Sequence, residues 1–159
     1  MRYEHLVEVN DPRVPLLPRL TRAQLWRGLV RRAEQPWEFV LGLNGATVHA
    51  RGHEGAVATL TRTLDFGSFV VHDRVLLTPL EQTRIETEAA AGFPASSLTI
   101  RIEEPHPQRL YLRFVYESAA VDGQGELDAV TVGLRNQAYE QADIDTVGRI
   151  RELAEQGLL

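Results

Sequence analysis

A run of short alternating segments between residues 46 and 118 constrains the fold most strongly. Short turn sequences such as Phe66-Gly67-Ser68 separate the segments, and no stretch between them is long enough for a crossover helix. Parallel strands need such crossovers, so the pattern predicts an antiparallel meander. Apolar and polar residues alternate, or β-branched residues accumulate, in six predicted strands: 46–52, 56–65, 69–78, 83–90, 97–103 and 110–118.

Further elements are predicted on both sides of this meander. Residues 3–9 alternate as a strand, and Thr21 with Gln24 forms a capping-box pattern before a helix that ends at Pro36. A second short helix is predicted from Pro36, and a long one over 126–156, after the turn at 123–125. The predicted fold class is α+β: a seven-stranded antiparallel sheet, two small helices after its first strand, and a long C-terminal helix across its concave face. We expect one domain spanning 1–159.

The apolar residues of the long C-terminal helix fall on two faces. At about 100° per residue, one face carries Leu127, Val130, Leu134, Ala138 and Ala142. Val147, Ile150, Leu153 and Ala154 lie almost opposite. One straight helix cannot bury both faces against the same sheet. Either the helix changes direction near 143–145, or its last turns face another element or subunit; of the two, we predict the change of direction.

Composition excludes several classes of function. The 159 residues include no cysteine, which rules out a disulfide framework and a thiol nucleophile. A net charge of −5 argues against nucleic acid, and the Arg31-Arg32 pair is too short for a basic patch. No apolar run approaches a membrane span, so we expect a cytoplasmic protein without a membrane partner. No metal or cofactor is predicted, because the histidines lack the spacing of convergent ligands: His5, His49, His53, His72 and His106.

Charged and polar residues interrupt the apolar faces of four strands. Arg62 falls among the apolar positions of 56–66, and Asp73 among those of 69–77. Both positions flank the turn at Gly67-Ser68, so the hairpin register places them opposite each other. His5 and Tyr116 lie on the apolar faces of their strands in the same way. The pair either anchors a ligand or acts as an acid/base site, or is a buried salt bridge that fixes sheet geometry.

These inward faces predict a cavity between sheet and helix. Tyr116 and Tyr139 are placed to donate hydrogen bonds into it. Its apolar lining is predicted from the sheet, with closure by the helix residues Leu134 and Ala138; the sheet residues are Leu60, Val71, Val75, Leu98, Ile100, Leu112 and Phe114.

The element order and several stretches resemble the START-like, helix-grip superfamily, and within it the branch called AtaL-like. The stretches are YEHLVEVNDP (3–12), LTRAQLWRGLVRRAE (20–34), DRV (73–75), SLTIRIEEP (97–105) and AYEQADIDTVGRIREL (138–153). The resemblance implies a curved sheet gripping the long helix around an internal cavity for an apolar or amphipathic molecule. The superfamily includes carriers, receptors, cyclases and substrate domains of oxygenases, so the fold does not fix the function.

Three hypotheses follow. The first is a binding protein that holds a small apolar or aromatic metabolite oriented by Arg62 and Asp73. The second is a cofactor-free enzyme of cyclase, isomerase or hydratase type, with Asp73 or His5 as general acid or base. The third is a protein-interaction module, or a homodimer, that uses the outward stripe of the last helix.

Overall fold

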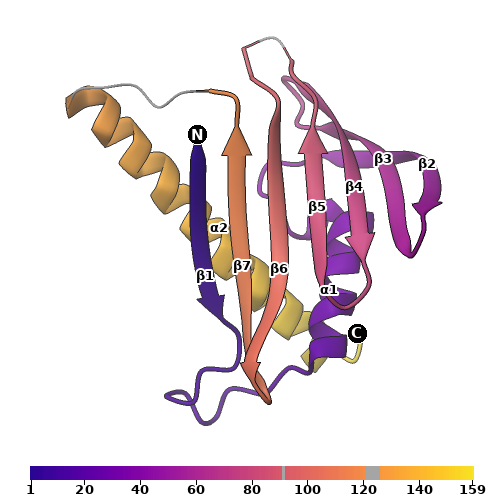
Figure 1. Cartoon of the computed structure of the whole chain (residues 1–159), viewed down its shortest axis with the longest axis vertical. Coiled ribbons are helices and arrows are strands. Elements are labelled where there is room, and N and C mark those ends of the chain that lie inside the picture. Colours follow the sequence, from indigo (N-terminus) through magenta and orange to yellow (C-terminus); the bar gives the residue numbers. More distant parts are fainter. Residues whose placement is uncertain (91, 121–125) are drawn as a thin grey trace.

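Seven antiparallel strands form one curved sheet in the computed structural model, which describes residues 1–90, 92–120 and 126–159 (Figure 1). Within these ranges the strands are β1 (Arg2–Glu8), β2 (Gly45–Glu54), β3 (Val57–Asp65), β4 (Val70–Thr78), β5 (Gln82–Thr87), β6 (Ser96–His106) and β7 (Arg109–Ser118). Their order across the sheet is β1-β7-β6-β5-β4-β3-β2, so β2 to β7 form the predicted meander and β1 pairs with the last strand.

Two helical segments follow β1, as the sequence predicts. Helix α1 covers Arg22–Glu34, and a single 3₁₀ turn, η1, covers Pro36–Glu38. The capping box at the start of α1 is confirmed: the backbone N–H of Gln24 donates to Thr21 Oγ1 at 3.1 Å, and the Thr21 N–H donates to Gln24 Oε1 at 3.0 Å. These bonds satisfy two donors that the first turn of a helix leaves open.

Helix α2 is uninterrupted from Glu126 to Glu155 and keeps its direction in Figure 1. The predicted change of direction near 143–145 is therefore wrong. Val147, Ile150 and Leu153 are buried, whereas Val130 and Leu134 are 59% and 62% exposed. In the N-terminal half of α2, polar residues occupy the helix face that is buried farther along. The apolar stripe of this half therefore faces solvent. The side chain of Leu127 and the turn predicted at 123–125 lie outside the part that is described.

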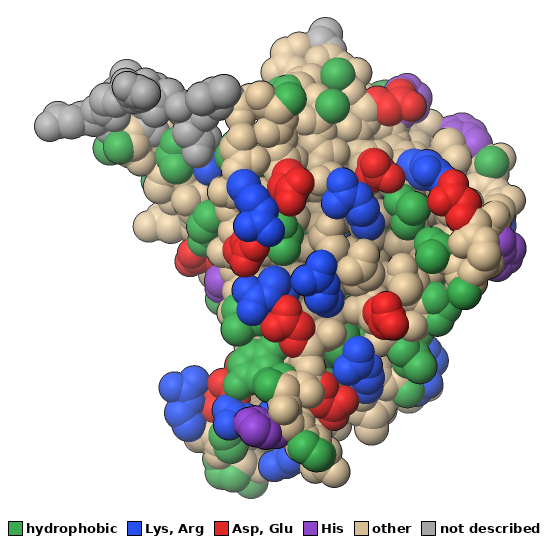
Figure 2. All heavy atoms as spheres, viewed as in Figure 1, with side chains coloured by type: hydrophobic (Ala, Val, Ile, Leu, Met, Phe, Trp, Pro, Cys, Tyr) green, Lys and Arg blue, Asp and Glu red, His purple; other side chains and the backbone are tan. Residues whose placement is uncertain are grey.

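The two faces of the sheet differ in charge. Figure 2 shows basic and acidic side chains interspersed over the outer face. Arg113, for example, pairs with Glu103 at 2.5 Å and with Glu4 at 3.1 Å. Alternation along each strand sends the neighbouring apolar side chains to the concave face, and the predicted phases of the strands are confirmed there.

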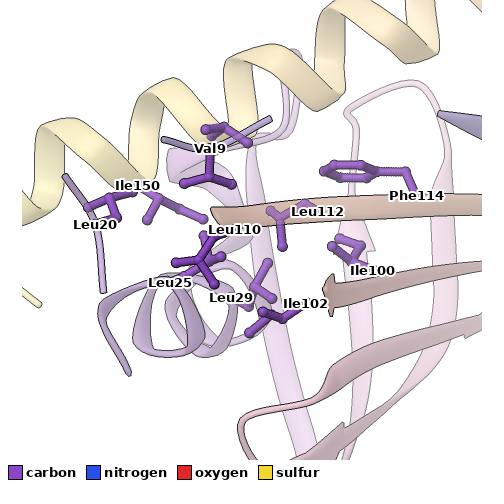
Figure 3. Packing of buried hydrophobic residues seen from close by; sticks show 11 residues of the cluster. Val9, Leu20, Leu25, Leu29, Ile100, Ile102, Leu110, Leu112, Phe114 and Ile150 are labelled. Carbon is purple, nitrogen blue, oxygen red and sulfur yellow. The ribbon is translucent and has the colours of Figure 1, made fainter. Parts of the chain in front are cut away.

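The concave face is filled at one end by α1 and the C-terminal half of α2. Phe114, Leu112 and Ile100 from the sheet pack with Leu29 of α1 and Ile150 of α2 (Figure 3). The two helices touch closely at Gly28, where an added Cβ would lie 2.6 Å from Ile150 Cγ2. This packing fills one end of the concave face with side chains.

Candidate ligand-binding site

Two adjoining hollows lie at the open end of the concave face, beside the N-terminal half of α2. The inner hollow has a volume of about 390 Å³, and Arg32, Arg62, Asp73 and Tyr116 contribute to its wall. The outer hollow has a volume of about 450 Å³, and Val70 and Phe93 belong to its wall. The two share a wall formed by Met1, Phe69, Val71, Thr87, Ser96 and Tyr139. Phe69 and Phe93 are 42% and 57% exposed, which places them at the mouth.

The structure places part of the predicted lining at the inner hollow and the rest inside the hydrophobic clusters. Val71, Leu98 and Tyr116 contribute to the inner hollow, together with Arg62 and Asp73. A second group is buried inside the hydrophobic clusters instead, because α1 and α2 pack directly onto it: Leu60, Val75, Ile100, Leu112 and Phe114. The predicted closure by α2 is wrong, since Leu134 and Ala138 are exposed on the face that points away from the sheet.

The Arg62–Asp73 pair forms as the hairpin register predicts. The two residues are directly opposed on β3 and β4, and their side chains are only 2% and 0% exposed. Arg62 Nε donates to Asp73 Oδ1 at 2.8 Å and Nη2 donates to Oδ2 at 2.6 Å. The remaining terminal nitrogen, Nη1, donates to the carbonyl of Ala33 at 2.8 Å. This pattern uses both carboxylate oxygens and all three guanidinium nitrogens, and it ties the end of α1 to the sheet.

A second arginine, Arg32, contributes to the inner hollow from the last turn of α1. Its Nε is buried without a hydrogen-bond partner, and among the described residues no hydrogen bond or ion pair reaches its guanidinium. Burial lowers the pKa of Arg32 below its ordinary value. A desolvated, unpaired charge is costly. Arg32 therefore brings a buried hydrogen-bond donor without a partner to the wall of the hollow.

A hydrogen-bonded group centred on the carboxylate of Asp143 joins β1, β7 and α2 beside the inner hollow. Tyr116 Oη donates to Asp143 Oδ1 at 2.5 Å, and His5 Nδ1 lies 3.2 Å from Asp143 Oδ2. Asp143 is 1% exposed. Burial raises its pKa to about 6, although the hydrogen bonds from Tyr116 and His5 act in the opposite direction. Burial and the nearby Asp143 carboxylate also raise the pKa of Tyr116, so its phenol stays protonated and continues to donate.

The two acid/base candidates from the sequence therefore differ in position. Asp73 lines the inner hollow, but both of its oxygens accept from Arg62. His5 contributes to neither hollow and faces Asp143 instead. Tyr139 lines both hollows, with its ring stacked on Tyr116 at 3.9 Å and 6° between planes. In this arrangement neither Asp73 nor His5 presents an unused titrating atom to the cavity.

Sequence reasoning missed Arg32 and Asp143, although helical spacing could have indicated both. Arg32 lies seven residues after Leu25 and three after Leu29, at the centre of the buried face of α1. Asp143 lies four residues before Val147 and seven before Ile150, on the buried face of α2. In both cases the residue is charged, and a search for apolar residues at helical spacing does not count a charged residue as part of the buried helix face.

Among the described residues, no three histidine or acidic side chains come together in a group that could hold a metal ion. Within the same ranges, no helix combines the length and apolar character that crossing a membrane requires.

Comparison with known proteins identifies the family. The family model described as "AtaL: Acetylaranotin biosynthesis cluster protein L" matches residues 7–157. The chain belongs to the AtaL family. This confirms the resemblance drawn from the opening, helical and strand stretches of the sequence. No curated protein matches this AtaL-family chain.

Solved structures that resemble the AtaL-family chain confirm the helix-grip fold. The di-domain ARO/CYC StfQ from the steffimycin biosynthetic pathway aligns with a TM-score of 0.66 at 7% identity, over 98% of this chain and 50% of that one. The chain thus spans half the length of StfQ. The Zhui aromatase/cyclase from Streptomyces sp. R1128 aligns with a TM-score of 0.61 at 14% identity, over 100% and 96% of the two chains. The Aha1 dimer from Colwellia psychrerythraea gives 0.58 at 8%, over 95% and 96%. At these identities the likeness concerns the fold alone.

Proposed function

We propose that this AtaL-family protein binds a small apolar, ring-bearing molecule in the two hollows between the sheet and the N-terminal half of α2. The observation that carries the proposal is that the hollows share a largely apolar wall, including Val71 and Phe69. Their volumes of about 390 and 450 Å³ fall within the range of about 300–1,000 Å³ typical of ligand pockets.

Aromatic side chains support a ring-bearing ligand. Phe66 and Phe69 stack with centroids 4.9 Å apart and 11° between planes, and Phe69 lies 5.5 Å from Phe93. Tyr116 and Tyr139 form the second stacked pair. Aromatic rings prefer offset-stacked or edge-to-face contact with other rings. The two pairs offer such surfaces at the mouth and inside the cavity.

The names of the similar structures and of the family model support a small organic ligand. Two of them are named as aromatase/cyclases, and the family model is named for a biosynthesis cluster. Proteins of those names act on or accompany small organic molecules, so the same ligand class is a reasonable expectation for this chain. The shared fold alone would not justify it.

The test is a titration with N-phenyl-1-naphthylamine, an uncharged aromatic probe whose fluorescence rises in apolar surroundings. Val71→Trp adds bulk to the shared wall of the hollows, and His72→Trp is its matched control. His72 is the next residue of β4, exposed on the opposite face. We expect saturable binding at one site per chain, weakened at least tenfold by Val71→Trp and unchanged by His72→Trp. Absence of saturable binding, or equal weakening by both variants, would contradict the proposal.

The competing hypotheses lack a comparable observation. Proton-transfer catalysis needs a titrating group within reach of the substrate, and both oxygens of Asp73 are engaged by Arg62. A protein-interaction module gains one supporting feature, the exposed Val130 and Leu134 on α2. However, it offers no explanation for an open cavity beside a half-buried arginine whose Nε is shielded from solvent without a partner.

A further inference from the structure

The guanidinium of Arg32 points to the chemistry of the ligand. Arg32 lies on the buried face of α1, and that face is held in place by the close contact between Gly28 and Ile150. The side chain reaches the inner hollow, and its Nε is shielded from solvent without a partner. A buried arginine normally has its planar set of donors matched by a carboxylate, a phosphate or carbonyls.

Building on the proposed function, we infer that the ligand carries an acidic oxygen group, such as a carboxylate, which binds the guanidinium of Arg32 while the rest of the molecule fills the apolar hollows. Arg62 provides the comparison within the same cavity wall. Its Nε and Nη2 hold the carboxylate of Asp73 in a bidentate contact at 2.8 and 2.6 Å. A ligand carboxylate can make the corresponding charge-assisted contact with Arg32.

The acidic residues around Arg32 are already committed to other partners. Asp73 is held by Arg62, and the two oxygens of Asp143 face Tyr116 and His5. Neither carboxylate forms an ion pair with Arg32 in the described part of the chain. Among the cationic side chains of the inner hollow, Arg32 is therefore the one that makes no ion pair in the described part of the chain.

The other arginine side chains that line the hollows, Arg62 and Arg135, already have partners. Arg62 has no guanidinium nitrogen left over, because Nη1 donates to Ala33. Arg135, on the wall of the outer hollow, contacts Asn136 and lies over the ring of Tyr139 at 5.9 Å. The chain as a whole carries a net charge of −5, so its overall field repels anions. Selection of an anion must then depend on a local charge inside the cavity.

A matched pair of probes tests this inference. 8-Anilinonaphthalene-1-sulfonate differs from N-phenyl-1-naphthylamine by one sulfonate, so the ratio of their affinities reports recognition of the negative charge. Titrations are made with the wild-type protein, with Arg32→Met and with Arg27→Met. Arg27 is exposed on the same helix, so its replacement removes the same unit of overall charge without touching the cavity.

For the wild type, we expect the sulfonate probe to bind at least tenfold more tightly than the neutral probe. Arg32→Met should remove that preference and leave binding of the neutral probe within twofold, whereas Arg27→Met should retain the preference. Equal affinity of the wild type for both probes, or an unchanged preference in Arg32→Met, overturns the inference while the binding function stands. Binding of neither probe overturns the proposed function and the inference together.

A second measurement keeps the inference falsifiable if Arg32→Met does not fold. Calorimetric titration of the wild-type protein with 1-naphthoic acid and with 1-naphthamide compares a carboxylate with its neutral isostere. Stronger binding of the acid supports the inference, and equal or weaker binding overturns it. Where Arg32→Met folds, its Tm without ligand should not fall below that of the wild type, since the variant removes a desolvated charge with no partner.

Discussion

Replacing Arg62 by methionine removes one partner of an ion pair that is buried on both sides, with exposed fractions of 2% and 0%. Loss of one partner costs about 3–5 kcal/mol, because the remaining charge of Asp73 stays desolvated. The Ala33 carbonyl also loses its donor at 2.8 Å, and an unsatisfied buried acceptor adds about 1–3 kcal/mol. We therefore expect Arg62→Met to lower the free energy of unfolding by at least as much as Asp73→Leu, which leaves Arg62 its bond to Ala33.

The double variant Arg62→Met/Asp73→Leu removes both charges. Apolar replacement of a buried pair is often neutral or stabilising, so the double variant should be more stable than either single variant. Urea unfolding followed by tryptophan fluorescence measures all four proteins. With an m-value of about 2 kcal/mol/M, a loss of 3–5 kcal/mol moves the midpoint down by about 1.5–2.5 M.

Two results would refute this reasoning. Single replacements that each cost less than about 1 kcal/mol would match an exposed pair rather than a desolvated one. Strictly additive effects in the double variant would show that the two side chains are not coupled. Binding of N-phenyl-1-naphthylamine separates the remaining roles: a folded double variant that still binds assigns the pair to the architecture, and one that does not bind makes it part of the ligand site.

Three further predictions concern α2 and its contacts. Asp143 is protonated more readily in the folded chain, with its pKa raised from 3.8 to about 6. Ionising it as pH rises from 3 to 7 should therefore destabilise the wild type relative to Asp143→Asn by about 3 kcal/mol; a difference that grows in the other direction would contradict this cause. Gly28→Ala should lower the free energy of unfolding by about 1–3 kcal/mol, because the added Cβ meets Ile150. Gly148→Ala, which has open space around it, should raise that free energy by about 1 kcal/mol. Urea unfolding midpoints measure both variants, and changes of the same sign would refute the packing argument. Leu134→Glu should change the free energy of unfolding by less than about 0.5 kcal/mol, since the side chain is 62% exposed; a larger loss measured by urea unfolding would mean that this face is covered.

The sequence by itself determined the strands, their order along the chain and the direction of their side chains. Period-two alternation fixes which face a residue occupies, because each step along a strand reverses the side chain. The short turn at Gly67-Ser68 set the register of β3 on β4, and this was enough to place Arg62 opposite Asp73. Local patterns also sufficed for the capping box at Thr21, since its hydrogen bonds join residues three apart.

Only the tertiary structure decided where along the concave face the cavity lies. Leu112 and Val71 both point inward, but α1 and α2 cover the first, while the second remains at an open hollow. That difference depends on where the helices dock, which strand periodicity does not encode. The orientation of α2 was likewise a tertiary matter: burying Asp143 with Tyr116 and His5 lets a straight helix present Val147 and Ile150 to the core and leave Leu134 in solvent. A hydrophobic pattern alone cannot anticipate this, because the free energy of burying a charged residue depends on partners that are distant in the sequence.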